Sequence, residues 1–208
     1  MARFCTTIFI TFLISTSVLG QTLTYEVMRG GKSMGQSVVK RDKKPNSVSY
    51  HLNTKTEFRV IFLIEVEYDL QEEFTKGCLT AGTGFNTLNG SLQKKTELKK
   101  RTKDYSLVID GIHTTISEDS IFDSVSEIYF EEPYDEKKVF SAYFGRYLTF
   151  EKTKDHQYVL TSPDGSNTYT YENGICVRVD ISRDFATFSQ VLQPDMLARV
   201  RKKEIKLE

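Results

Sequence analysis

The side chains that could do chemistry are scattered along this chain and do not form a motif. The three histidines, His51, His113 and His156, have no histidine, cysteine or carboxylate neighbour at metal-ligand spacing. A phosphate-binding glycine loop, an HExxH helix and a CxxC pair are all missing from the sequence. We therefore predict no catalytic, cofactor-binding or metal-binding residue, and a protein that is not an enzyme.

Two groups of carboxylates offer the strongest chemical alternatives. Glu65, Glu67 and Asp69 alternate along one run, so they share a strand face, and carboxylate pairs can hydrolyse glycosides. We expect a solvated face instead, with the basic residues 94–100 as cross-strand partners. The acidic run at residues 131–136 could bind a hard cation such as calcium, but it lacks EF-hand spacing and fits a charged surface loop.

Two cysteines, Cys78 and Cys176, lie outside the first twenty residues. In an oxidising compartment they could pair and close a long loop, which would stabilise the fold by about 2–4 kcal/mol. Neither spacing nor pattern requires the bridge, so free thiols are the alternative. Cys176 is out of phase with Ile175 and Val177, which predicts that its side chain faces away from them.

The elements that must position any site are strands. Residues 48–74 alternate apolar and polar side chains, a period of two that predicts a sheet with one covered face. Because the run exceeds the usual ~3–10 residues, we divide it near residues 59–63. Glycine and asparagine turns predict further hairpins, with residues 91–101 as a lysine-rich edge strand and residues 139–151 as one strand bent at Gly145. Gly82 and Gly84 indicate a bend of the sheet or the close approach of another group.

One stretch changes period. Five apolar residues spaced as one face of a helix predict a helix over about residues 118–130: Ile121, Phe122, Val125, Ile128 and Tyr129. We expect this single helix to pack on the concave face or at the mouth of a strongly curved antiparallel sheet, an open or half β-barrel, with its apolar face acting as a lid. The aromatic content, 14 Phe and 11 Tyr, supplies ordinary core or the lining of an apolar cavity.

The start of the chain resembles an export signal. Residues 1–3 carry a positive charge, residues 4–19 are mostly apolar, and the small Gly20 allows cleavage before Gln21. The alternative, a membrane anchor, requires about 20 apolar residues, and no other stretch approaches that length. We expect residues 21–194 to form one β-rich domain and residues 195–208 a basic, frayed tail. The balance of 28 basic and 28 acidic residues argues against nucleic acid as a partner.

Several segments together resemble a family of exported bacterial proteins of unknown function. They are residues 25–27 with the glycines that follow, residues 126–133, and residues 162–165 followed by 169–174. The family has no assigned activity, so no catalytic residue carries over. The chain is also similar in architecture to half-barrel periplasmic proteins that wrap a curved sheet around a helix, including lipoprotein and lipid carriers. This resemblance implies a periplasmic or secreted location and an apolar ligand.

The sequence thus predicts an exported, non-enzymatic carrier domain for a lipid or another apolar small molecule. The alternative is a structural or interaction domain that binds a cell-envelope protein through its edge strands.

Overall fold

A computed structural model describes residues 19–59, 62–135, 137–184 and 186–204, which contain fourteen strands, one 3₁₀ turn and one α-helix. The strands are β1 (Leu19–Arg29), β2 (Lys32–Lys44), β3 (Ser47–Arg59), β4 (Leu63–Thr75), β5 (Cys78–Leu88), β6 (Ser91–Lys100), β7 (Tyr105–Ile109), β8 (Ile112–Ile116), β9 (Lys138–Ser141), β10 (Arg146–Lys154), β11 (Gln157–Ser162), β12 (Gly165–Glu172), β13 (Ile175–Arg183) and β14 (Ala186–Leu192). The predicted export signal lies almost entirely outside the described residues.

All fourteen strands belong to one antiparallel sheet. Its order is β8-β7-β6-β5-β4-β3-β2-β1-β14-β13-β12-β11-β10-β9. Every pair of strands adjacent in sequence is therefore paired in the sheet except β8 and β9, and the pairing of β1 with β14 brings the two ends of the strand sequence together. Within the described residues the two end strands, β8 and β9, do not pair with each other. The predicted curved antiparallel sheet, open and barrel-like, is therefore confirmed.

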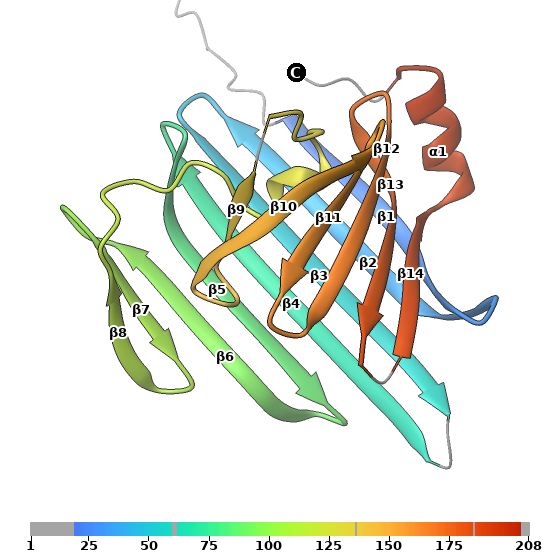
Figure 1. Cartoon of the computed structure of the whole chain (residues 1–208), viewed down its shortest axis with the longest axis horizontal. Coiled ribbons are helices and arrows are strands. Elements are labelled where there is room, and N and C mark those ends of the chain that lie inside the picture. Colours follow the sequence, from blue (N-terminus) through green and yellow to red (C-terminus); the bar gives the residue numbers. More distant parts are fainter. Residues whose placement is uncertain (1–18, 60–61, 136, 185, 205–208) are drawn as a thin grey trace, which may run out of the picture.

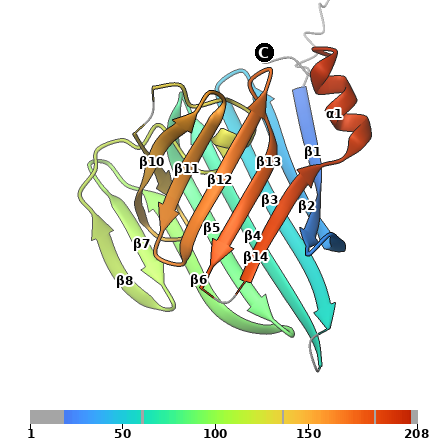
Figure 2. The same ribbon diagram turned by 45° about the vertical axis from the view of Figure 1, so that its right-hand side comes forward.

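The sheet folds over on itself. Strands β9–β13 lie across β2–β6 as a second layer, while the β7–β8 hairpin projects to one side (Figures 1 and 2). Residues 121–130, which we call the inner segment, lie between the two layers and include the 3₁₀ turn η1 (Glu127–Tyr129). The core thus forms where the concave face of the sheet meets this segment.

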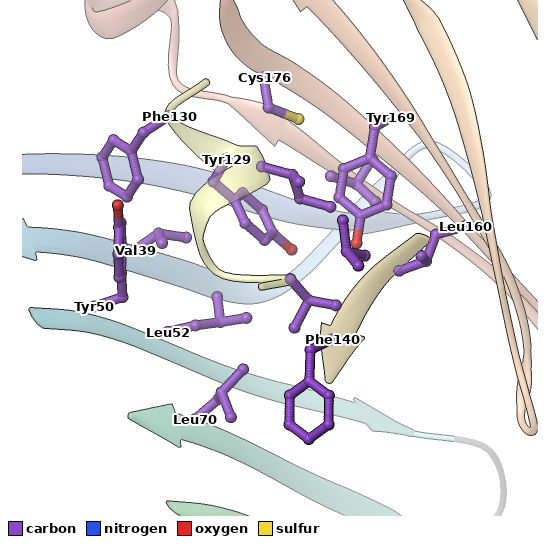
Figure 3. Packing of buried hydrophobic residues seen from close by; sticks show 14 of the residues in the cluster. Val39, Tyr50, Leu52, Leu70, Tyr129, Phe130, Phe140, Leu160, Tyr169 and Cys176 are labelled. Atoms are coloured by element: carbon purple, nitrogen blue, oxygen red, sulfur yellow. The ribbon is translucent and has the colours of Figure 1, made fainter. Parts of the chain in front are cut away.

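Figure 3 shows how side chains from both layers meet around the inner segment. Tyr129 lies between Tyr25 and Tyr169, with ring centroids 5.7 and 5.8 Å away in edge-to-face geometry, while Phe130 packs against Tyr50. Edge-to-face aromatic pairs of this kind add about 0.5–1.5 kcal/mol beyond the area they bury. The inner segment therefore serves as a core element shared by the two layers.

The predicted helix over residues 118–130 is wrong. The first part of the inner segment bonds to neighbouring strands and loops: Leu79 N–H donates to Ile121 O, Val125 N–H to Phe140 O, and Phe140 N–H to Asp123 O. Within the segment, Phe130 N–H donates to Glu127 O and closes the 3₁₀ turn. Only η1 is helical. The apolar spacing had a different cause, because an irregular segment between two layers buries side chains on several sides without a helix.

Two bulges determine which side chains of β5 and β13 face the core. In β5, Phe74 pairs with Leu79 but Glu73 pairs with Ala81, so one extra residue puts Leu79, Gly82 and Gly84 on the same inner face. A Cβ on Gly82 would lie 2.8 Å from Ala142 Cβ, and thus the close approach predicted as one alternative comes from the chain itself. These glycines make room for the β9–β10 turn.

In β13 the extra residue is Val177, because Tyr171 pairs with Cys176 and Thr170 with Arg178. Cys176 consequently points into the core, as Figure 3 shows, and the prediction that it faces away is wrong.

The predicted frayed tail contains the α-helix of the structure, α1 (Pro194–Arg201). Proline at its first turn suits a helix start. Val200 is fully buried, Asn173 Nδ2 donates to its carbonyl at 3.0 Å, and Arg201 makes a bidentate pair with Glu172 at 2.7 and 2.9 Å. These contacts join the helix to the end of β12 and the β12–β13 turn, and the helix lies next to β1 and β14 (Figure 2).

Three smaller predictions are also corrected. Strand β6 is not an edge, because β7 and β8 continue the sheet beyond it. The predicted strand at residues 139–151 is a hairpin, with β9 and β10 joined by a turn that includes Gly145. Phe62, expected on the apolar face, is 77% exposed.

Candidate ligand cavity

A cavity of about 600 Å³ lies between the two layers. Its size falls within the ~300–1,000 Å³ of small-molecule sites. Most lining residues come from the inner faces of both layers, and they reach the turns that end β3, β11 and β13. They are Val27, Leu52, Thr54, Thr56, Phe58, Val66, Tyr68, Asn86, Val125, Tyr129, Ser141, Tyr143, Phe144, Leu148, Leu160, Ser162, Asp164, Asn167, Tyr169, Ile181, Arg183, Asp184, Phe188 and Gln190.

The inner segment forms the floor of the cavity through Val125 and Tyr129. Tyrosine hydroxyls from the sheet hold this segment in place. Tyr171 Oη donates to Ile128 O at 2.7 Å, and Tyr105 Oη accepts from Ile121 N–H at 3.0 Å. Because a buried backbone group without a partner costs about 1–3 kcal/mol, these bonds make the floor rigid.

The walls of the cavity are aromatic. Tyr68 and Tyr143 meet edge to face at 5.1 Å, and Tyr143 Oη donates to Asn86 Oδ1 at 2.9 Å. Nearer the turns, the ring centroids of Phe58 and Phe188 lie 6.4 Å apart. Such a lining, with a few fixed polar groups, is typical of sites for apolar or amphiphilic molecules.

Two cations lie at the mouth, defined here as the end where the lining residues reach the turns. Lys94 Nζ lies 4.5 Å from the centroid of Tyr143 and 4.6 Å from that of Phe144, both cavity residues. Arg183 lines the cavity directly. The sequence analysis missed both, although Arg183 keeps the two-residue spacing of Val179 and Ile181 along β13.

Buried carboxyl groups lie behind the floor. Glu72 is fully buried and accepts a 2.6 Å hydrogen bond from the Ser124 hydroxyl. Burial raises the pKa of Glu72, and hydrogen bonds from Ser124 and Ser126 offset only part of this rise. Burial, together with the carboxylates of Glu131, Asp123 and Glu72, raises the pKa of Glu127 to about 7. These groups line no part of the cavity, so we assign them to the support of the floor.

The acidic residues that directly follow the inner segment are anchored from both layers. Arg41, 1% exposed, pairs with Glu131 at 2.6 Å, and its guanidinium lies 4.9 Å from the Phe130 centroid. Glu132 accepts from Tyr158 Oη at 2.9 Å and contacts His156 Nδ1 at 3.0 Å. The predicted surface loop at residues 131–136 thus buries part of its charge against the fold.

The five predicted lid residues have separate places. Val125 and Tyr129 line the cavity, Ile121 and Ile128 are buried in the core, and Phe122 is 57% exposed. They form no single face, but the segment they define does close one side of the cavity.

The other candidate residues lie away from the cavity. Glu67 and Asp69 pair with neighbours on β3 and not with residues 94–100: Glu67 with Lys55 at 3.1 Å, and Asp69 with His51 at 2.7 Å. His113 lies on the exposed strand β8. None of these pairs lines the cavity.

Both cysteines are free thiols. Cys78 is partly exposed beside Tyr105 Oη at 3.3 Å, whereas Cys176 is buried and burial raises its pKa to about 12. Of the two alternatives, the structure thus shows free thiols and no bridge between Cys78 and Cys176.

One pattern escaped the sequence analysis. Gly31, Ser33 and Gly35 have the spacing of a GxSxG nucleophile turn. They lie at the β1–β2 hairpin, where no helix follows, and Ser33 is exposed at the start of β2. The strand–turn–helix context that gives this motif its chemistry is missing, so Ser33 is no nucleophile candidate.

Across the described ranges, no group of three or more His, Cys, Asp or Glu side chains is arranged to hold a metal ion. The same ranges include no helix with the length and apolar character needed to cross a membrane.

Comparison with known proteins agrees with this architecture. The sequence profile of a domain of unknown function, DUF6134, matches residues 25–193. A crystal structure of a β-barrel-like protein of the domain of unknown function DUF1849, from Brucella abortus, is similar in fold with a TM-score of 0.57 and 10% identity; the similarity covers 85% of this chain and 96% of that one. No curated protein matches the chain at a significant level.

Proposed function

This chain belongs to the DUF6134 family, whose members share a domain of unknown function, and we propose that it is a non-enzymatic binding or carrier protein for a lipid or another apolar ligand. The observation that carries the proposal is the 600 Å³ aromatic-lined cavity with a rigid floor. Export through residues 1–20 to the periplasm, or out of the cell, is part of the same proposal.

The surface beside the mouth supports the proposal. Phe62, Leu63, Leu88 and Leu92 are 77, 41, 41 and 57% exposed, and they lie in or next to the β3–β4 and β5–β6 turns. Asn89 N–H donates to Glu65 O, which joins the bases of these two turns. Apolar side chains grouped on a surface often mark a site of contact with lipid or protein, so an apolar ligand would meet them on its way to the cavity.

The first test is native mass spectrometry of the protein purified from the periplasm without detergent. We expect a discrete extra mass that organic solvent releases as a lipid or small apolar molecule. A bare chain, together with failure to bind any apolar probe in vitro, would refute the proposal. The same spectrum shows whether the mature chain begins at Gln21.

A variant tests the place of binding. Val125→Trp adds a large side chain at the cavity floor, so the protein should lose its ligand and keep its fold. Phe122→Trp, in the same segment but pointing to solvent, is the matched control and should keep the ligand. If Val125→Trp does not fold, Val66→Phe near the mouth replaces it. Full ligand load in a folded cavity variant would contradict this site.

One observation favours a second candidate function, the binding of an envelope protein. Strand β8 ends the sheet, pairs only with β7 in the described residues, and carries Ile112 at 73% exposure. Such an edge can accept an extended segment of a partner. A photo-crosslinker at Thr114 should then capture one constant partner in cells, whereas the same group at Lys152 on β10 should not; equal capture at both positions would count against it.

A further inference from the structure

Resting on the proposed function, we propose that the ligand is an anionic amphiphile: its apolar tail fills the cavity and its carboxylate or phosphate head group binds Lys94 and Arg183 at the mouth. The two cations come from opposite layers of the sheet, β6 and β13. A single head group between them would therefore contact both layers. The inference is carried by the position, burial and lack of ion pairs of these two side chains.

Hydrogen bonds fix the guanidinium of Arg183 at the cavity wall. Its Nη1 donates to Asn167 Oδ1 at 3.0 Å, Ser182 O at 2.8 Å and Ser166 O at 3.3 Å, all uncharged oxygens. These bonds fix the guanidinium at the cavity wall and leave its charge unneutralised. A fixed guanidinium is well suited to a carboxylate or phosphate, because its planar donors can bind two oxygens at once.

Lys94 approaches the same place from the other layer. Its ammonium rests on the rings of Tyr143 and Phe144, and burial lowers its pKa despite the nearby Asp164. Burial and the nearby carboxylates of Asp164 and Asp110 raise the pKa of the Tyr143 hydroxyl, and the charge of Arg183 opposes this rise. The two cations thus flank one tyrosine of the cavity wall.

Neither cation belongs to any ion pair formed within the described residues. Two carboxylates, Asp164 and Asp184, also line the cavity. Both are exposed, whereas Lys94 and Arg183 are half-buried. Water screens these exposed carboxylates more strongly than it screens the half-buried cations, so a head group in direct contact with Lys94 and Arg183 meets only weakened repulsion from them.

The experiment measures binding of three ligands with the same tail: dodecanoate, dodecyl phosphate and dodecanol. Each competes with the neutral fluorescent probe N-phenylnaphthylamine below its micelle concentration. We expect both anions to bind at least about tenfold more tightly than dodecanol, the size of one charge-assisted hydrogen bond. The tighter of the two anions identifies the head group as carboxylate or phosphate.

The variants assign the effect to the mouth. Lys94→Gln and Arg183→Gln should each weaken anion binding about tenfold and leave dodecanol unchanged. Asp164→Asn should strengthen it by up to about fivefold, because it removes an opposing exposed charge. Lys95→Gln is the matched control, since Lys95 faces outward and pairs with Glu97 at 2.6 Å. If Arg183→Gln does not fold, Lys94→Gln and Asp164→Asn carry the test.

The outcomes separate this inference from the proposed function. Equal affinity for dodecanol and the two anions, or anion binding unchanged in Lys94→Gln and Asp164→Asn, would overturn the head-group assignment and leave the cavity as an apolar site. Failure of all three ligands and of the probe to bind would overturn the proposed function as well.

Discussion

Replacing Glu127 by glutamine should stabilise the protein at neutral pH and leave it unchanged in acid. Glu127 lies in η1 behind the cavity floor, where Tyr50 Oη donates to its Oε1 at 3.4 Å. Burial, and then the carboxylates of Glu131, Asp123 and Glu72, raise its pKa from 4.5 to about 7. The folded state therefore keeps a proton on Glu127 that the unfolded chain has already released.

The sign and size of the effect follow from proton linkage. Below pH 4.5 Glu127 is protonated in both states, so it contributes no difference. As pH rises from 4.5 to about 7 the folded state binds more protons than the unfolded state, and stability falls by about 1.4 kcal/mol per pH unit, or about 3 kcal/mol in total. Glutamine cannot ionise, so Glu127→Gln should be about 3 kcal/mol more stable than the wild type above pH 7.

The assay is urea unfolding of both proteins at pH 4, 5.5, 7 and 8, with the difference in unfolding free energy plotted against pH. Glu172→Gln is the control of opposite sign: its pKa is lowered by Arg201, and its loss should cost about 0–1 kcal/mol at neutral pH, as for other surface pairs. A difference between Glu127→Gln and the wild type that is the same at every pH would refute the reasoning.

Two further predictions concern the support of the floor and the thiols. Tyr105→Phe should lower the free energy of unfolding in urea by about 1–3 kcal/mol, because it leaves the buried Ile121 N–H without its partner. Tyr134→Phe, at an exposed position, is the control and should have little effect. Equal stability of Tyr105→Phe and the wild type would contradict the role of the Tyr105 hydroxyl. In the native protein Cys78 should react with a thiol reagent, and Cys176 should react only after unfolding. Partial burial raises the pKa of Cys78, but hydrogen bonds from Tyr105, Ser120 and Ile121 outweigh it and lower the pKa. Cys176 is buried, and burial raises its pKa. Mass mapping of the modified cysteine checks this, and native labelling of Cys176 would contradict it.

The sheet was predictable because the signals that specify it lie within short stretches of the sequence. Apolar alternation along residues 48–74 and glycine or asparagine at the turns gave the hairpins, and the hairpins gave the antiparallel order. A bulge, in contrast, adds one residue whose effect depends on the partner strand. The apolar alternation around Cys176 therefore predicted the wrong face for its side chain.

The candidate site was less predictable because long-range contacts determine it. Val125 and Tyr129 were identified for the wrong reason, as part of a helix, since a burial pattern does not report the backbone conformation that produces it. Lys94 and Arg183 lie far apart in the sequence, on β6 and β13, and only the folding of one sheet over itself brings them to one mouth. No local pattern encodes that meeting.

The tyrosines explain how an irregular segment can stand in the core of a β protein. A buried stretch that is neither helix nor strand cannot satisfy its own N–H and C=O groups, so its neighbours must supply donors and acceptors. Here Tyr105 and Tyr171 supply them to Ile121 and Ile128, and their rings add apolar area at the same positions. Phenylalanine would provide the area alone. Inward-facing tyrosines on strands are therefore a sequence signal for a buried irregular segment, and in this protein that segment is the floor of the cavity.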